Sequence, residues 1–563
     1  MTVGKNLSKN IFNKRIMGIE SFIKKLPLVL ISIVLLASLL RLYNIGVNPP
    51  GVHADEADTG YSAYSILKTG LTQYGEFNLL ALGEFNGGTH PPLYTYILIP
   101  LISLFGLNIV IERMPAVIFG ILTIPIFYYL IKRLSFSEPV ARLGALLMAL
   151  NPWHIFISRQ GLLESIAVFF VSLGVLLFLM GKEKKNMYIL SAVSLGLSLH
   201  SYDAPKIFVL PFVFLLTIYQ WESLVKAKKH FILFIVILAL FYGLTLKVLF
   251  LDKQINDFNR INSFNIGTIS KTVNDERQMT QGPLWMSSIF HNKITVMSKQ
   301  YISNYFNIFS ISWFFVDGHG DLLEWMGRHG QFYMFELPFF FIGLYLAFKK
   351  KKIGMLLVAW ILIAHIPGAI TTGKFYPYRS VLILPIPIIF SSIGIVWFWK
   401  WLSKAPPFTF ILRTAFLCVC VGIILSLMFT YFYDYPVYAS EWRFKERNQA
   451  LNFASSIQNK YDRVFVNGGT EWAVMYSFND KILPSTFQKA YLNKGEYKDV
   501  KTIDVGKFSF GSFDVQKVAT PSSYFSKNSL VVIDSGIFPN HPSLKTFSGA
   551  DPLKIIYKVI EVK

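Results

Sequence analysis

The sequence predicts a polytopic α-helical membrane protein with about eleven transmembrane helices and a C-terminal α/β domain outside the membrane. The chain is 53% hydrophobic and only 15% charged, which is typical of a membrane protein. Its apolar residues gather in runs of about 20, the length that crosses a bilayer as a helix. After Tyr433, charged residues, Asn, Ser and Gly become frequent and short β-like runs appear, which indicates a small soluble domain.

Candidate spans and connectors alternate regularly along the chain. The candidate spans are residues 26–44, 110–131, 138–157, 162–180, 186–201, 204–220, 231–250, 332–348, 353–372, 378–401 and 410–433. The connectors are by turns basic and polar or acidic, so the positive-inside rule puts the basic ones in the cytoplasm. The apolar segment from Pro92 to Phe105 would reverse this alternation if it spanned the membrane. We therefore expect an interfacial or re-entrant helix there, and a C-terminus outside the cell membrane.

This topology divides the chain into three regions. Residues 1–25 form a basic cytoplasmic N-terminus, residues 26–433 form the transmembrane domain and residues 436–563 form the extracytoplasmic domain. Two outer connectors are long, namely residues 45–109 and residues 251–330. The net charge of +21 does not indicate a nucleic-acid partner, because the Lys and Arg residues separate the spans instead of gathering on one soluble part.

Three carboxylates in four residues begin the first outer connector. They are Asp55, Glu56 and Asp58. The pattern from Glu56 to Leu67 predicts an amphipathic helix along the membrane surface, with Asp55 at or before its N-terminus. An Asp there is often only a helix cap, but capping accounts for one carboxylate of the three. The functional interpretation makes Asp55 a general base with Glu56 beside it. The three carboxylates could also hold a divalent cation, although the expected reaction requires none.

Further polar residues lie at the outer ends of the predicted spans. His90 precedes a double Pro that begins a helix, a place where phosphate can bind; the alternative is a solvated loop histidine. Arg159 could anchor to lipid phosphate or clamp a substrate phosphate. Glu164 enters lipid depth, so it should face a cavity or a partner. An Arg159–Glu164 ion pair is the alternative for these two residues.

Two other outer turns carry candidate binding residues. Tyr202 and Lys206 lie in a hairpin whose polar groups could be turn chemistry alone. Tyr378 and Arg379 end an outer cluster that begins at Lys374, which could anchor in the lipid interface or form a rim that binds phosphate and sugar. The sequence has no Gly-rich nucleotide loop, Walker motif or zinc signature.

The order of these motifs resembles the protein O-mannosyltransferases and their bacterial relatives, including the lipid A aminoarabinose transferases. These are membrane glycosyltransferases of the GT-C fold, related to glycosyltransferase family 39. The motifs are Asp55-Glu56, His90-Pro91-Pro92-Leu93, Glu112-Arg113-Met114-Pro115-Ala116 and Arg159 followed five residues later by Glu164. The resemblance covers about the first 220 residues. It implies a polyprenyl-phosphate sugar donor, Asp55 as the base and Arg159 in contact with the lipid phosphate. The aminoarabinose transferases carry Lys where this chain has His90, which speaks against that donor.

The expected function is sugar transfer from a polyprenyl-phosphate donor to an acceptor hydroxyl at the outer face, with inversion. Asp55 takes the proton, and Arg159, with His90 and Arg379, stabilises the departing phosphate. The acceptor is a protein, a lipid or a glycan, and membrane lipids surround the protein. One alternative is a transporter or flippase of lipid-linked sugars, in which charges usually lie at the bilayer midplane. The other is a polymerase or ligase of lipid-linked glycans, in which Arg-rich outer loops would be expected.

Overall fold

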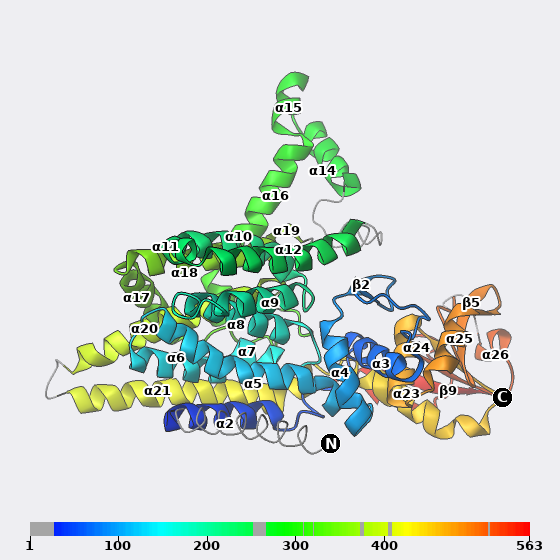
Figure 1. Cartoon of the computed structure of the whole chain (residues 1–563). Helices are drawn as coiled ribbons and strands as arrows, with labels where there is room; N and C mark the ends of the chain where they lie inside the picture. Colours follow the sequence, from blue (N-terminus) through cyan, green and yellow to red (C-terminus); the bar gives the residue numbers. More distant parts are fainter. Residues whose placement is uncertain are drawn as a thin grey trace, which may run out of the picture.

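The computed structural model has a helical bundle, a helical arm at its side and a C-terminal α/β domain at one end (Figure 1). The structure describes residues 27–250, 266–307, 309–318, 320–371, 377–403, 408–515, 518 and 520–563. The predicted cytoplasmic N-terminus 1–25, residues 251–265 of the second long connector, and Lys374 lie outside the described residues.

The helices of the bundle coincide with the candidate spans. They are α2 (Leu28–Leu42), α5 (Ile109–Arg133), α6 (Glu138–Leu150) with α7 (Pro152–Ile157), α8 (Glu164–Met180), α9 (Met187–Leu199), α10 (Ala204–Tyr219), α12 (Lys228–Phe250), α17 (Glu336–Phe348), α18 (Lys351–Ala364) with α19 (Ile366–Ile370), α20 (Pro385–Leu402) and α21 (Thr409–Phe429). By length and composition, five segments among the described residues can cross a membrane, and six apolar helices of 10–17 residues are shorter. The protein is therefore a helical membrane protein, whereas the number of spans and their orientation stay predictions.

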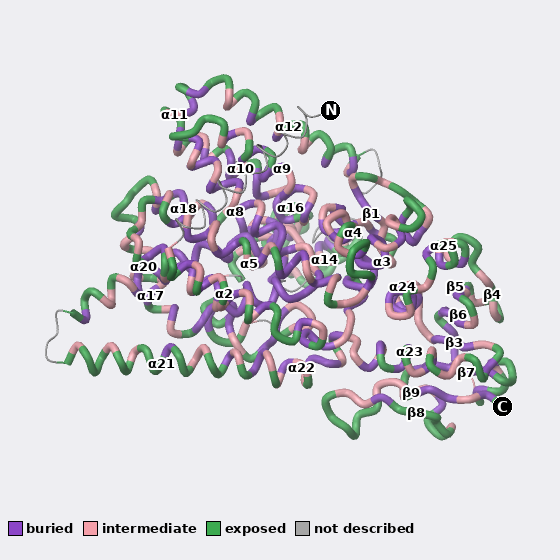
Figure 2. The backbone as a smooth tube through the Cα atoms, turned by 60° about the horizontal axis from the view of Figure 1, so that its bottom comes forward, coloured by how far each residue is buried: buried purple, intermediate pink, exposed green. Residues whose placement is uncertain are grey.

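The bundle packs tightly inside and exposes apolar side chains outside. Gly343 and Gly394 let α17 and α20 approach closely, since a Cβ on Gly343 would lie 1.8 Å from the carbonyl oxygen of Phe390. In Figure 2, α12 and α21 are largely exposed, and their exposed residues include Leu240 and Leu425. In water this surface would be costly, so it is the surface that lipid covers.

Helices α3 (Ala54–Thr69) and α4 (Leu93–Phe105) lie between the bundle and the C-terminal domain (Figure 1). A short antiparallel pair, β1 (Leu82–Gly83) and β2 (Thr89–His90), precedes α4. The expected apolar face of α3 exists and packs against the C-terminal domain, whereas its position at the membrane surface stays a prediction. Tyr61 is fully buried, its ring packs on Phe487 at 5.6 Å and its hydroxyl donates to the carbonyl of Ile482 at 2.9 Å. The face binds the C-terminal domain because that domain supplies apolar partners. Whether α4 spans the membrane or lies in the interface stays a prediction.

A seven-stranded mixed sheet forms the centre of the C-terminal domain. Its strands are β3 (Arg463–Asn467), β4 (Gly495–Tyr497), β5 (Val500–Val505), β6 (Phe508–Gly511), β7 (Ser529–Asp534), β8 (Lys545–Ser548) and β9 (Ile555–Val562), in the order β4-β5-β6-β3-β7-β9-β8. Strand β3 is parallel to β6 and β7, and the other pairs are antiparallel. Helices α23 (Lys445–Ile457), α24 (Thr470–Asn479) and α25 (Pro484–Leu492) pack around this sheet and α3. The side of the membrane on which this domain lies stays a prediction.

Candidate active site

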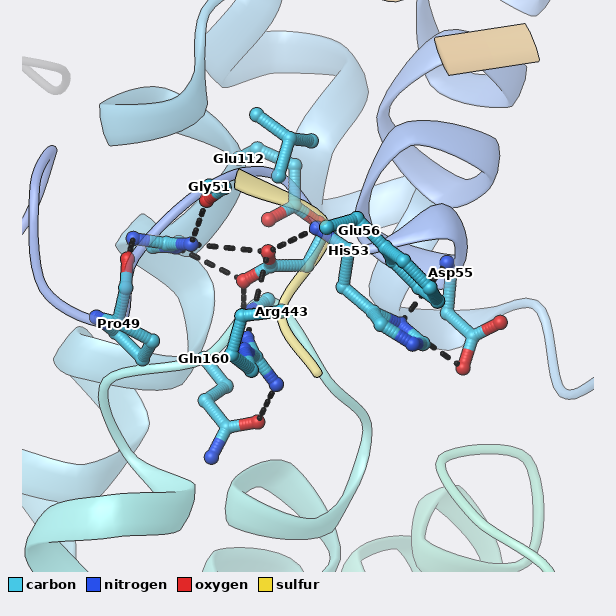
Figure 3. A network of polar contacts seen from close by, with 12 residues as sticks. Pro49, Gly51, His53, Asp55, Glu56, Glu112, Gln160 and Arg443 are labelled. Atoms are coloured by element: carbon cyan, nitrogen blue, oxygen red, sulfur yellow. Dashed lines mark hydrogen bonds and ion pairs between the residues drawn. The ribbon is translucent and has the colours of Figure 1, made fainter. Parts of the chain in front are cut away.

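Glu56 is a fully buried anion at the point where α3, α5 and the C-terminal domain meet (Figure 3). Its two carboxylate oxygens accept bidentate hydrogen bonds from Arg113 at 2.8 and 2.9 Å. They also accept from the backbone N–H groups of Gly161 at 2.9 Å and His53 at 3.0 Å. The guanidinium of Arg443 lies 3.6 Å away. Each oxygen is thus engaged by at least two donors.

These contacts favour a positioning role for Glu56 over that of a proton acceptor. Burial alone would raise the pKa of Glu56, but the charges of Arg113 and Arg443 hold this pKa well below its usual range. The remaining donors of Arg113 bind the carbonyls of Ile45, Pro49 and Gly51, and so fix the start of the first outer connector. A catalytic role for Glu56 thus stays a prediction, and its contacts favour a positioning role.

Asp55, one residue earlier, lies in the opposite environment. Its side chain is 53% exposed, and one carboxylate oxygen lies 3.4 Å from Nδ1 of His53. His53 caps α3, because its ring accepts from the Asp55 N–H while Glu56 accepts from the His53 N–H. Helix capping therefore does not explain Asp55. In Figure 3 its carboxylate lies on the far side of His53 from Glu56 and Arg443. Asp55 is thus the carboxylate of this group that an approaching hydroxyl can reach.

Asp58 is engaged elsewhere, so the three carboxylates do not converge. Its Oδ1 accepts from Gln73 at 2.7 Å and from the Tyr74 hydroxyl at 2.5 Å. Burial raises the pKa of Asp58 to about 7, against the effect of these two hydrogen bonds. In the described part of the chain, no group of three or more His, Cys, Asp or Glu side chains could hold a metal ion. Asp55, Glu56 and Asp58 thus have different partners, and a cation held by them stays a prediction.

Arg159 was predicted to bind the donor phosphate, but its guanidinium is fully buried and engaged. A guanidinium has five N–H donors. Four of them bind carbonyls at 2.7–2.9 Å and the fifth binds the Tyr431 hydroxyl at 3.2 Å. The carbonyls belong to Leu40, Arg41, Tyr43 and Asn48, at the C-terminal end of α2 and in the turn after it. Arg159 therefore caps a helix end that would otherwise lack donors. The alternative ion pair with Glu164 is not formed either.

A second group of polar side chains surrounds Glu164 at the N-terminus of α8. Glu164 is 5% exposed, accepts a hydrogen bond from Tyr202, and has one carboxylate oxygen without a hydrogen-bond partner among the described residues. Asp55 and Asp203 are close enough to interact with it electrostatically. Lys206 forms an ion pair with Asp203 at 2.6 Å. Asp55, Tyr202 and Asp203 thus lie within electrostatic range of Glu164, and Lys206 joins them through Asp203; a binding role for these residues stays a prediction.

Two acidic residues of this group were not anticipated from the sequence. Burial, together with the charges of Asp55 and Asp58, raises the pKa of Glu84 to about 8. Burial raises the pKa of Glu324 to about 9, against the opposing charge of Arg379. No motif marks either residue, since each lies in a connector whose course only the fold determines.

Glu324 is held in place by hydrogen bonds to its neighbours in the chain. The carbonyl of Leu323 accepts from the Tyr378 hydroxyl at 3.1 Å and from Arg443 at 3.3 Å. The carbonyl of Leu322 accepts from the Tyr435 hydroxyl at 2.8 Å. Tyr378 also donates to Gln160 at 2.9 Å and is buried. Tyr378 therefore holds the backbone next to Glu324 in place. Arg379 is half-buried and interacts with Glu324 and Tyr202.

His90 lies beside this group and is buried, so the solvated-loop alternative is wrong. Its Nε2 lies 3.3 Å from the Thr95 hydroxyl and its Nδ1 lies 3.7 Å from Glu84. Burial lowers the pKa of His90 to about 4, against the charges of Asp55 and Asp203. His90 is therefore neutral at pH 7 and contributes hydrogen bonds rather than a positive charge.

The fold is similar to that of a known membrane protein. The chain aligns with the crystal structure of ArnT from Cupriavidus metallidurans bound to undecaprenyl phosphate, with a TM-score of 0.50 and 11% identity over 94% of this chain and 97% of that one. An oligosaccharyltransferase from Archaeoglobus fulgidus gives a TM-score of 0.47 at 13% identity, covering 94% of this chain and 73% of that chain. At 11% identity, the likeness to ArnT shows a shared fold over nearly the whole chain.

The sequence comparison is specific for the N-terminal part. Residues 31–252 match the family described as dolichyl-phosphate-mannose-protein mannosyltransferase. The protein YycA of Bacillus subtilis (strain 168), a mannosyltransferase by name, is 27% identical over 230 residues, or 40% of this chain. The match covers 32% of the length of that relative.

Proposed function

We propose that the protein transfers a sugar from a polyprenyl-phosphate donor to an acceptor hydroxyl at the outer face of the membrane, with Asp55 as the general base. The observation that carries this proposal is the contrast between Asp55 and its neighbours. Glu56 and Asp58 are buried and engaged, whereas the Asp55 carboxylate is exposed and lies within electrostatic range of Glu164. The shared fold with a structure that holds undecaprenyl phosphate supports a polyprenyl phosphate as the lipid part of the donor.

The reaction is a single displacement with inversion at the anomeric carbon. The acceptor oxygen forms a bond to that carbon as its proton passes to the Asp55 carboxylate. The bond between the anomeric carbon and the phosphate oxygen breaks, and its electron pair leaves with the polyprenyl phosphate. Because phosphate is a good leaving group, one base and a stabilising cation are sufficient, and no metal is required in this scheme.

Arg379 is the cation that we assign to the departing phosphate. It belongs to the outer turn Pro377–Ile383 and is half-buried beside Tyr202 and Glu324. A fixed cation at the place where charge develops stabilises the transition state more than the ground state. Arg159 cannot take this role without giving up its bonds to the end of α2.

The carboxylates around Glu164 are suited to the sugar. Carboxylate oxygens accept hydrogen bonds from hydroxyl groups, and Glu164 has such an oxygen without a partner among the described residues. Glu324 contributes a second unpartnered oxygen of the same kind, again within the described chain. These two residues and Tyr202 would orient the ring, while the acceptor, a protein, a lipid or a glycan, approaches from the exposed side of Asp55.

Purified protein in detergent, supplied with a polyprenyl-phosphate hexose, tests this proposal against a transporter. An enzyme releases polyprenyl phosphate and transfers or hydrolyses the sugar without a sealed bilayer, whereas transport requires one. We expect turnover in detergent and a lower kcat for Arg379→Gln, with Arg142→Gln on the exposed part of α6 as the matched control. Turnover that is absent in detergent and appears only as transport across vesicles would overturn the proposal.

A further inference from the structure

A helical arm projects from the side of the bundle (Figure 1). It consists of α14 (Ile266–Gln278), α15 (Leu284–Phe290) and α16 (Lys293–Asn307). A small apolar core of Ile269, Val273 and Val296 joins α14 to α16, and His291 pairs with Glu276 at 2.7 Å. At the base of the arm, the Tyr305 hydroxyl donates to the carbonyl of Leu362 at 3.0 Å. The arm is therefore an ordered element that is fixed to α18.

The tip helix α15 has its burial pattern reversed. It buries Ser287, which is 4% exposed, and exposes Leu284 at 86% and Trp285 at 65%. Ile289 and Phe290 on the same helix are exposed as well. Each square ångström of apolar surface left in water costs about 25 cal/mol, so an exposed patch of this kind indicates a binding surface.

The direction of the arm identifies what covers this patch. The arm leaves the bundle sideways, across the direction of α12 and α21, whereas the C-terminal domain lies at the end of the bundle (Figure 1). The exposed residues Ile302 and Phe306 on α16 continue the apolar surface toward Leu362 of α18, which is exposed at the flank of the bundle. The arm thus carries exposed apolar residues on both α15 and α16 and joins the bundle at Leu362, which is itself exposed.

The charges and the aromatic residue of the arm fit a lipid interface. The arm has an excess of two positive charges. It contains the four cations Lys271, Arg277, Lys293 and Lys299 and the two anions Asp275 and Glu276. Cations favour phosphate head groups, and Trp is enriched where head groups meet acyl chains. A helix with an apolar face and a net positive charge binds in the plane of that interface.

We propose that the arm is a lateral membrane anchor, with α15 inserted into the outer lipid interface beside the bundle. A second copy of the chain or an acceptor polypeptide on this patch would be a different outcome, and the experiment below separates them. The inference is independent of the sugar-transfer reaction.

An environment-sensitive fluorophore on a Leu284→Cys variant tests this anchor. The free cysteines Cys418 and Cys420 are first replaced by Ser. The protein is placed in nanodiscs of phosphatidylethanolamine and phosphatidylglycerol, with or without a quencher on the upper part of the acyl chains. We expect about twofold quenching at position 284, as for a group buried in the interface, and little at an exposed Glu496→Cys control on β4.

Two outcomes would overturn the anchor. One is fluorescence at position 284 that the lipid quencher leaves unchanged. The other is a signal that depends on protein concentration or on added acceptor but not on the quencher, which would assign the patch to a protein partner. If the labelled variant does not fold, the wild type and Trp285→Phe serve instead. The lipid-quenched part of the intrinsic tryptophan emission should then decrease in Trp285→Phe, and an unchanged quenched part contradicts the anchor equally.

Discussion

The adjacent carboxylates Asp55 and Glu56 have different roles because the fold buries Glu56 and leaves Asp55 exposed. Glu56 holds two arginines from distant parts of the chain, whereas Asp55 remains open to the outer face. Arg113 divides its donors between the Glu56 carboxylate and three backbone carbonyls, and Arg159 binds four backbone carbonyls and the Tyr431 hydroxyl, so both arginines fix backbone. The buried charges of Glu56, Arg113 and Arg159 thus fix the geometry of the site.

Replacing Glu56 should therefore destabilise the protein strongly, and replacing Asp55 should not. Glu56→Gln leaves Arg113 and Arg443 with a buried charge that lacks its partner, which typically costs about 3–5 kcal/mol. Asp55→Asn changes an exposed side chain and should alter stability by no more than about 0.5 kcal/mol. Thermal unfolding in detergent, followed by size-exclusion chromatography, compares the two variants. Equal stability of both variants would contradict the assigned roles.

The pH dependence of stability tests the burial of Asp58. The folded state holds the Asp58 proton up to about pH 7, whereas the unfolded chain releases it near pH 4. Stability therefore falls as the pH rises from about 4 to 7, because the unfolded state binds fewer protons in this window. Asp58→Asn keeps the oxygen acceptor for Tyr74 and lacks this titration. Its Tm relative to wild type should rise between pH 4 and pH 7, and a constant difference contradicts the prediction.

At this scale the sequence identified where the site lies better than what each residue does. It could point to Asp55, Glu164, Tyr202 and Arg379, because charged and polar groups at the ends of apolar runs are costly without a function. It could not show that Asp55 is exposed and Glu56 buried. The side chains of neighbouring helix residues point in different directions, and the sequence pattern alone does not define which one points inward. Glu324 was missed because its position depends on hydrogen bonds to Leu322 and Leu323 from other elements.

Among the elements, the connection between α7 and α8 is the most constrained. Gly161 lies in it, donates its N–H to Glu56 and packs against α5. A Cβ at this position would lie 1.6 Å from a carboxylate oxygen of Glu112. Only glycine allows α5, α8 and the start of α3 to meet here.

Gly161→Ala should therefore lower both stability and turnover, because the connection must move and the bond to Glu56 is strained. Gly243→Ala on α12 is the matched control, since nothing lies within 4 Å of a Cβ there. Helix propensity favours Ala over Gly by about 1 kcal/mol, so the control should be neutral or more stable. Thermal unfolding and detergent turnover measure both effects. Normal turnover and stability in Gly161→Ala would show that the close approach is wrong.

The helices of the bundle could be predicted from the sequence because long apolar runs have few alternatives to a helix in lipid. The partner of α3 could not, since an amphipathic pattern shows that a face is buried but not what buries it. The arm was not expected for a related reason. Loops in water usually expose polar side chains, whereas the tip of the arm exposes apolar ones.

The whole molecule behaves as one unit because α3 and the C-terminal domain share an apolar core. Tyr61 and Phe487 lie in the same buried cluster as the strands β3 and β6, and Arg443 reaches Glu56 from the other side. The C-terminal domain is thereby packed against the site region of the bundle. Which side of the membrane holds this assembly rests on the distribution of basic connectors.

Tyr61→Ala should loosen this connection. Truncating a fully buried aromatic side chain usually costs about 3–5 kcal/mol, and here the loss falls on the contact between α3 and the domain. Limited proteolysis should then release the C-terminal domain faster than in wild type. Tyr64→Ala, at a partly buried position on the same helix, is the control and should change the rate less. Equal rates for all three proteins would contradict the shared core.

The most direct test of the account is the turnover of Asp55→Asn together with its affinity for a polyprenyl-phosphate hexose. Loss of a general base lowers turnover by about 10²–10⁴, while donor affinity should stay unchanged because Asp55 does not hold the lipid phosphate. Asp275→Asn, on the exposed face of α14, should leave turnover and affinity unaltered. Asp55→Asn with normal turnover would contradict the account.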